Sequence, residues 1–77
     1  MPRTSPGETM LKMAERHVTV AERLVARQEG RVASLERHER PEATAKARTL
    51  LATLHTILAT ARNHLVIQRR KSNGGKL

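Results

Sequence analysis

The 77-residue sequence contains no cysteine and no aromatic residue. The absence of cysteine excludes a disulfide framework and thiolate chemistry. Without Phe, Trp and Tyr, a core has to be built from Leu, Ile, Val, Met and Ala, which suits helix packing and offers little to a barrel or a sandwich. The same absence excludes the binding of single-stranded nucleic acid by stacking of bases on aromatic rings.

The sequence also lacks a long apolar run. No stretch approaches the ~20 apolar residues of a membrane-spanning helix, and residues 1–8 lack the apolar segment of a signal peptide. We therefore expect a bacterial, cytoplasmic protein without a transmembrane segment. Its length allows one domain over residues 1–77, near the size at which the core of a single chain is marginal.

Acidic residues are missing from the second half of the sequence. All seven lie within residues 1–42, while residues 43–77 hold seven of the 15 basic residues, and the net charge is +8. Such an excess of positive charge favours anionic partners, which include nucleic acid, an acidic protein and an anionic membrane surface.

A heptad repeat runs through the first half of the sequence. Residues at alternating steps of three and four form its seam: Leu11, Ala14, Val18, Ala21, Val25, Gln28, Val32 and Leu35. This spacing predicts a helix that winds around a neighbouring helix, as in a coiled coil. A Glu follows every second seam residue, at positions 15, 22, 29 and 36. These glutamates are either solvated charges worth tenths of a kcal/mol each or determinants of how a partner helix is oriented.

The first helix is expected over about residues 6–38. Ser5 suits the N-cap, Pro6 the first helical position, and Glu8 completes a capping box. Gly30 interrupts this helix at a cost of about 1 kcal/mol relative to Ala. A mild bend or close contact with another backbone would each explain the glycine.

Pro41 predicts a turn at residues 38–41, because proline disfavours helical geometry in the residue before it and suits the first position of a new helix. A second helix is then expected over about residues 41–71, followed by a flexible tail at 72–77. The two helices have similar lengths and are expected to fold back on each other as an antiparallel hairpin. No glycine marks the end of the first helix, so a single kinked helix is the alternative.

The second helix carries more apolar surface than one neighbour covers. Its predicted seam is Ala43, Ala47, Leu50, Leu54, Ile57, Ala61, His64 and Gln68, and a second apolar row is Leu51, Leu58 and Leu65. We therefore expect an all-α, coiled-coil-like hairpin that forms a homodimer, a four-helix bundle. The residues predicted for the core and dimer seam are Leu11, Val18, Val25, Gln28, Val32, Leu50, Leu51, Leu54, Ile57, Leu58 and Leu65.

Basic residues at steps of seven form a stripe on the far face of the second helix. With the residues that continue it, the candidate anion-binding set is Arg48, His55, Arg62, Arg69, Arg70 and Lys71. Regularly spaced cations on a rigid helix would contact successive phosphates of structured RNA or duplex DNA. The alternatives are a solvated basic face and a face paired with the glutamates of another chain.

Three polar residues lie on or near the seams. Gln28 either fixes the register of the helices or lies at the rim with its amide in water. His17 and His64 are brought near each other by the hairpin, but the Glu-x-x-His pattern of di-iron bundles is absent. No nucleophile, carboxylate pair or phosphate-binding loop suggests catalysis. We therefore expect no enzyme activity, no metal and no cofactor.

A set of short stretches recurs in a known family: residues 14–18 (AERHV), 21–23 (AER), Gln28, 35–37 (LER) and 47–54 (ARTLLATL). Over about residues 10–65 the sequence thereby resembles a family of small alphaproteobacterial helical-hairpin proteins of uncharacterised function. The resemblance implies a helical hairpin and supplies no functional residues. In that family the turn usually carries Gly-His-Asp, where this sequence has residues 37–41 as Arg-His-Glu-Arg-Pro. The expected function is that of a non-catalytic interaction and oligomerisation module, with nucleic-acid binding as the alternative.

Overall fold

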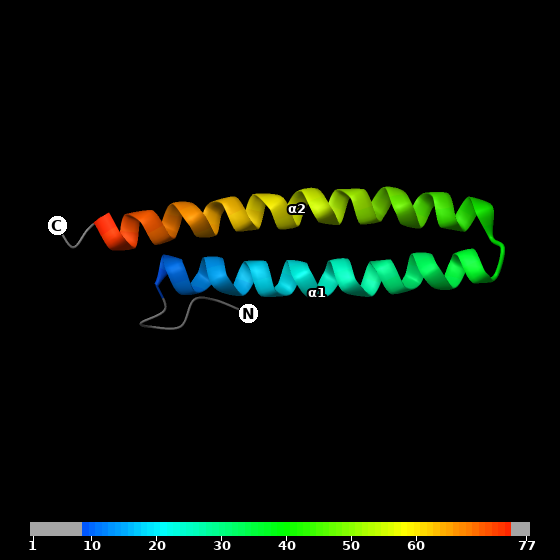
Figure 1. The fold of residues 1–77 in the computed structure, drawn as a ribbon, viewed down its shortest axis with the longest axis horizontal. Helices are drawn as coiled ribbons and strands as arrows, with labels where there is room; N and C mark the ends of the chain where they lie inside the picture. Colours follow the sequence, from blue (N-terminus) through cyan, green and yellow to red (C-terminus); the bar gives the residue numbers. More distant parts are fainter. Residues whose placement is uncertain (1–8, 75–77) are drawn as a thin grey trace, which may run out of the picture.

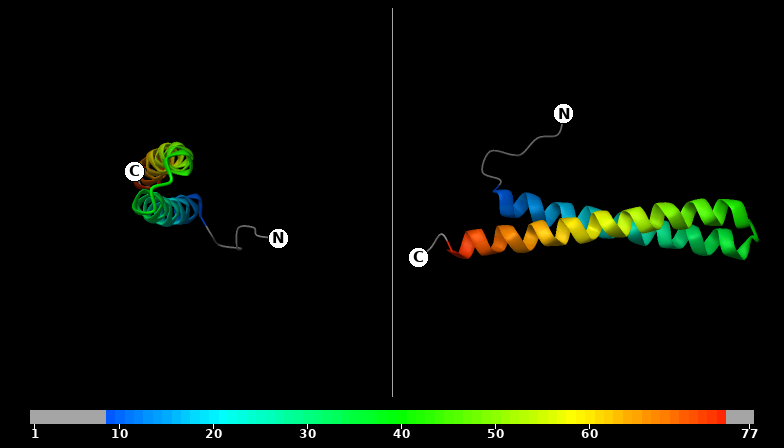
Figure 2. Two further views of the ribbon diagram at one scale, coloured as in Figure 1. Left: turned by 90° about the vertical axis from the view of Figure 1, so that its right-hand side faces the viewer. Right: turned by 90° about the horizontal axis from the view of Figure 1, so that it is seen from above.

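The computed structural model describes residues 9–74, with side chains to residue 72. It contains two α-helices, α1 (Met10–Arg37) and α2 (Pro41–Gly74), and no strand in the described range. The helices run antiparallel and pack side by side (Figure 1). Seen along the hairpin they lie next to each other, and seen from above they cross near mid-length (Figure 2). The predicted all-α hairpin is thus confirmed, and the alternative of one kinked helix is wrong.

The start of α1 corrects the expected one. Thr9 has an extended backbone, with φ −88° and ψ 167°, and is the N-cap of the helix. Its hydroxyl oxygen accepts a hydrogen bond of 3.0 Å from the backbone N–H of Lys12, which satisfies one of the unpaired donors of the first turn. The helix therefore begins at Met10 and not near Pro6. The capping box predicted at Ser5 and Glu8 lies outside the described residues.

The turn between the helices is closed by backbone hydrogen bonds around a residue in the left-handed region. Glu39 has φ 53°. Its N–H donates to the carbonyl of Glu36, and the N–H of Arg40 donates to that of Leu35. This pair of bonds is a Schellman motif, which usually has glycine at the left-handed position. Here a glutamate holds that position, at a cost of about 1–2 kcal/mol, so the end of α1 carries no glycine signal.

Pro41 is the first residue of α2, as its missing N–H predicted. Thr44 then donates from both its backbone N–H and its hydroxyl to the carbonyl of Arg40, at 2.8 and 2.7 Å. The far end of α2 differs from the prediction, because the helix continues three residues past Lys71, to Gly74. The first part of the expected flexible tail is therefore helical, and residues 75–77 lie outside the described range.

The predicted seam of α1 is confirmed at all eight positions. Five of its residues are buried, namely Ala14, Ala21, Val25, Gln28 and Val32. The other three, Leu11, Val18 and Leu35, are half-buried. The seam is confirmed because it is the one row of α1 that stays apolar at this spacing almost throughout, whereas the row of Met10, Met13, Val20 and Leu24 continues with Arg27 and Arg31.

The predicted seam of α2 is partly wrong. Leu50 and Ile57 are each 49% exposed, and His64 is exposed too. The face in contact with α1 instead uses the second apolar row together with the positions that both rows share. Its residues are Thr44, Ala47, Leu51, Leu54, Leu58, Ala61, Leu65 and Gln68, all buried or half-buried.

The core of the hairpin lies at mid-length and is thin. Ala21, Val25 and Leu58 form its buried cluster, against which Val18, Leu51 and Leu54 pack. The small Ala21 meets the large Leu58, so that the helices interdigitate. Among the described residues no large side chain is completely buried. Two helices alone therefore shield their apolar side chains incompletely.

Candidate interaction surfaces

The seam between α1 and α2 has two flanks. On α1, a residue that follows a seam position lies about 100° to one side of it, and a residue that precedes it lies about 100° to the other side, because the helix has 3.6 residues per turn. The same holds for α2. The residues of one flank are mostly charged and those of the other are mostly apolar.

The first flank carries a row of ion pairs between the helices, which we call the ionic ladder. Its pairs are Glu22–Arg62, Glu29–His55 and Glu36–Arg48. The Arg62 guanidinium donates to a Glu22 carboxylate oxygen at 3.3 Å, and the His55 Nε2 lies 3.9 Å from a Glu29 oxygen.

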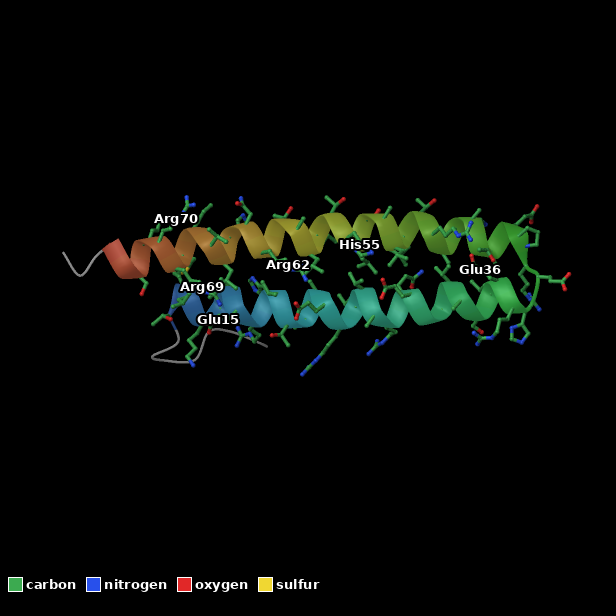
Figure 3. All side chains as sticks on the ribbon, in the orientation of Figure 1. Glu15, Glu36, His55, Arg62, Arg69 and Arg70 are labelled. Atoms are coloured by element: carbon green, nitrogen blue, oxygen red, sulfur yellow. The ribbon has the colours of Figure 1, made fainter. Side chains whose placement is uncertain are left out.

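Each pair of the ladder lies seven residues further along α1 and seven residues back along α2 than the one before, which is the geometry of two antiparallel heptad repeats. Glu15 and Arg69 occupy the next step of this pattern and lie at the same level of the hairpin (Figure 3).

The ladder contributes more to orientation than to stability. Its side chains are 44–62% exposed, and exposed ion pairs are typically worth about 0.2–1 kcal/mol each. A shift of α2 by one heptad would keep apolar residues in the seam but would remove one rung. Three glutamates of α1 therefore face α2 of their own chain, which supports the interpretation that they orient a helix, with α2 as that helix.

The ladder places three of the candidate anion-binding residues beside carboxylates of the same chain. Arg48 and Arg62 each face a carboxylate, which offsets their positive charge, and His55 lies beside the carboxylate of Glu29. Arg70 points away from α1 (Figure 3). With Lys71 it lies near the end of α2, which extends past the start of α1 (Figure 1). The structure thus divides the predicted stripe into a paired part and a part at the open end of the hairpin.

The second flank is an apolar groove along the hairpin, made of three hollows in a row. The middle hollow, of about 450 Å³, lies over Ala21 and Ala61 and joins the open-end hollow through His17 and His64. The third hollow lies at the turn end. Seven large hydrophobic side chains are exposed in the described part of the chain, and five of them line these hollows: Met10, Val20, Leu24, Leu50 and Ile57.

Charge is distributed unevenly along the groove. Arg31 and Lys46 line the hollow at the turn end. The open-end hollow is lined by neither lysine nor arginine. No acidic side chain lines any of the three hollows, since the described glutamates lie on the ladder side or in the turn region. The middle hollow is mostly apolar but has Arg16 in its wall, so basic residues line the middle and the turn end of the groove and not its open-end hollow.

The two histidines predicted to meet do so, because His17 of α1 and His64 of α2 line the same two hollows. The other side chains that line these hollows are apolar, amide, threonine and arginine side chains. Within residues 9–74, three or more His, Cys, Asp or Glu side chains do not gather in a way that could hold a metal ion. The pair is thus part of the groove wall.

Gln28 is buried in the seam and does not lie at the rim. It is 7% exposed, and its amide nitrogen donates a hydrogen bond of 3.0 Å to the backbone carbonyl of Ala47 on α2. A buried polar group of this kind stabilises the one register in which its partner is in reach. Gln28 and the ladder therefore specify the same alignment of α1 and α2.

Gly30 lies on the outer face of α1. A Cβ built there would meet nothing within 4 Å. Close contact with another backbone of the hairpin therefore does not explain this glycine.

In the described helices, no segment is both long and apolar enough to cross a membrane.

Sequence reasoning missed the groove itself, because it placed Leu50 and Ile57 in the seam, and it missed Thr44 as a buried residue. The available signal was that α2 has two apolar rows that share Ala47, Leu54 and Ala61.

No protein-family model, no curated protein and no solved structure matches the chain.

Proposed function

We propose that this protein is a non-catalytic helical interaction module that forms a homodimer through its apolar groove, as a four-helix bundle of two hairpins. The observation that carries the proposal is the gathering of five of the seven exposed large hydrophobic side chains on one flank. Contiguous exposed apolar surface of this kind is typical of protein interaction sites.

The thin core supports the same conclusion. The groove side chains are 39–61% exposed in the single hairpin, and covering the exposed part of each would contribute about 1 kcal/mol. A second hairpin has the length and the apolar flank to cover all of them at once, in a closed two-fold assembly.

Sedimentation equilibrium at micromolar concentration tests the proposal. We expect a native mass twice the 8.6 kDa of one chain. The double variant Leu50→Lys/Ile57→Lys places two charges in the groove and should give a folded chain of single mass or a much weaker dimer. Val66→Lys is the matched control, because Val66 is 43% exposed but lies outside the groove. A wild-type mass of one chain would refute the homodimer.

A second candidate function is the binding of nucleic-acid phosphates by the open end of α2. The observation in its favour is that Arg70 and Lys71 lie beyond the paired part of the stripe, at the end of α2 that extends past α1 (Figure 1). Electrophoretic shift of duplex RNA and duplex DNA at two salt concentrations tests it, because phosphate contacts weaken steeply with salt. Arg70→Ala/Lys71→Ala should weaken binding more than Arg48→Ala. No shift at low salt would remove this function.

A further inference from the structure

The hollow at the open end of the groove is lined by soft donor atoms. Two of the three methionines of the chain and two of its four histidines meet there. Thioether sulfur and neutral imidazole nitrogen are ligands that suit Cu(I), whereas the carboxylates that harder cations prefer do not line this hollow. The hollow has a volume of about 280 Å³, and its lining residues are Met10, Met13, Ala14, His17, His64 and Gln68.

Helix geometry explains why these side chains share one hollow. Met10, Met13 and His17 follow one another on α1 at steps of three and four residues, and residues at these steps lie on one face with their Cβ atoms about 5–6 Å apart. His64 joins them from α2. Ala14, only 6% exposed, leaves room beneath them. Because methionine side chains are flexible, the two sulfurs can adjust to an ion without movement of the helices.

The charge of this hollow fits a singly charged ion better than a doubly charged one. Lysine, arginine, aspartate and glutamate are all missing from its lining, and Arg16 lines the middle hollow instead. Without an anionic ligand, the cost of removing water from a divalent cation is not offset, whereas neutral soft ligands suit Cu(I). The expectation of no metal rests on the lack of carboxylate partners for the histidines, and the methionine sulfurs are donors of another kind.

From the shared hollow and its ligand chemistry we infer that Met10, Met13, His17 and His64 form a binding site for one Cu(I) ion. Met10 is 61% exposed and both histidines are exposed, so the ion can enter from solvent. All four ligands belong to one chain, so the site does not depend on the proposed homodimer. A bound ion would connect the open ends of α1 and α2.

Titration with Cu(I) under anaerobic conditions, in competition with a coloured Cu(I) chelator, tests the site. We expect one ion per chain and a rise in the thermal unfolding temperature, because the ion binds the folded chain alone. The X-ray absorption spectrum of the bound copper should show both sulfur and nitrogen neighbours. Zn²⁺ should bind much more weakly, because thioether ligands favour the softer ion.

Variants of the ligands make the test specific. Met10→Leu/Met13→Leu removes both sulfurs and keeps the apolar volume. It should weaken Cu(I) binding at least about tenfold, because even the loss of a residue that only orients a ligand weakens metal affinity by about 10–100-fold. His17→Gln/His64→Gln should have a similar effect. His55→Gln is the matched control, because His55 lies on the ladder flank, and it should bind Cu(I) as the wild type does.

The Leu50→Lys/Ile57→Lys variant separates the site from the homodimer, because neither residue lines the open-end hollow. Binding of Cu(I) by this variant and not by the wild type would support the site and show that a second copy covers it. Three results would each overturn the inference: no binding by either protein, equally tight binding of Zn²⁺, or unchanged binding in Met10→Leu/Met13→Leu. The methionines would then be gap-filling side chains of the groove. The native mass from sedimentation decides on the homodimer separately.

Discussion

The two flanks of the helix seam differ in what they present to solvent. The ladder flank carries Glu22, Glu29 and Glu36, each facing a basic side chain of α2. The groove flank carries large apolar side chains and no acid. The ladder satisfies its charges within one chain, while the groove exposes apolar surface that the chain cannot cover. The comparison indicates that one flank orients the two helices and the other is available to a partner.

The largest effect is expected when a leucine of the seam and a leucine of the groove are each replaced by alanine and the stability and mass of the two variants are compared. Leu58 is 5% exposed and Leu50 is 49% exposed. Leu58→Ala should lower the free energy of unfolding by about 2–5 kcal/mol, because it leaves a cavity in the core, and should leave the native mass unchanged. Leu50→Ala should weaken the dimer. Urea unfolding followed by circular dichroism, together with sedimentation, measures both, and equal losses of stability would break the distinction between seam and groove.

A smaller effect is expected on the outer face of α1, which belongs to neither flank. Gly30 has open space around it, so Gly30→Ala should raise the free energy of unfolding by about 1 kcal/mol through helix propensity alone. Thermal unfolding measures the gain. If the substitution weakened the dimer instead, the outer face would be part of the interface, and the assignment of contact to the groove flank would be wrong.

The smallest effect is expected on the ladder. Arg62→Glu places a like charge opposite Glu22 and should cost less than about 1 kcal/mol, because both side chains are more than half exposed. The double variant Glu22→Arg/Arg62→Glu should restore the pair. Salt at about 1 M, where the screening length is about 3 Å, should remove the difference. A loss of several kcal/mol, unaffected by salt, would show that the ladder carries far more stability than its exposure allows.

The sequence predicted the fold where only one interpretation of a pattern was available. The seam of α1 was confirmed in full because only one apolar row runs the length of this helix, and Pro41 located the turn because its ring restricts the backbone on both sides. The start of α1 was predicted too early. Ser5 and Thr9 are both good N-caps, and local propensity does not rank two capping residues one turn apart.

The candidate sites were harder to predict, because they depend on how α2 is rotated against α1. The basic stripe was visible at steps of seven, but which of its residues face glutamates of the same chain was not. Gln28 was recognised as a polar seam residue, yet whether its amide reached water or the carbonyl of Ala47 depended on the neighbouring helix. Spacing along one helix contains no information about the level of the other.

Two helices, the turn before Pro41 and the face of α1 that becomes buried follow from the sequence alone, because they depend on backbone chemistry and on the one apolar row that runs the length of α1. Which apolar row of α2 meets α1 depends on tertiary packing. The two rows lie one residue apart and differ most clearly at one level, where one has His64 and the other Leu65. The row of Leu51, Leu58 and Leu65 faces α1, and this rotation also brings the basic side chains of α2 beside the glutamates of α1. The same rotation turns Leu50 and Ile57 outward and so creates the groove.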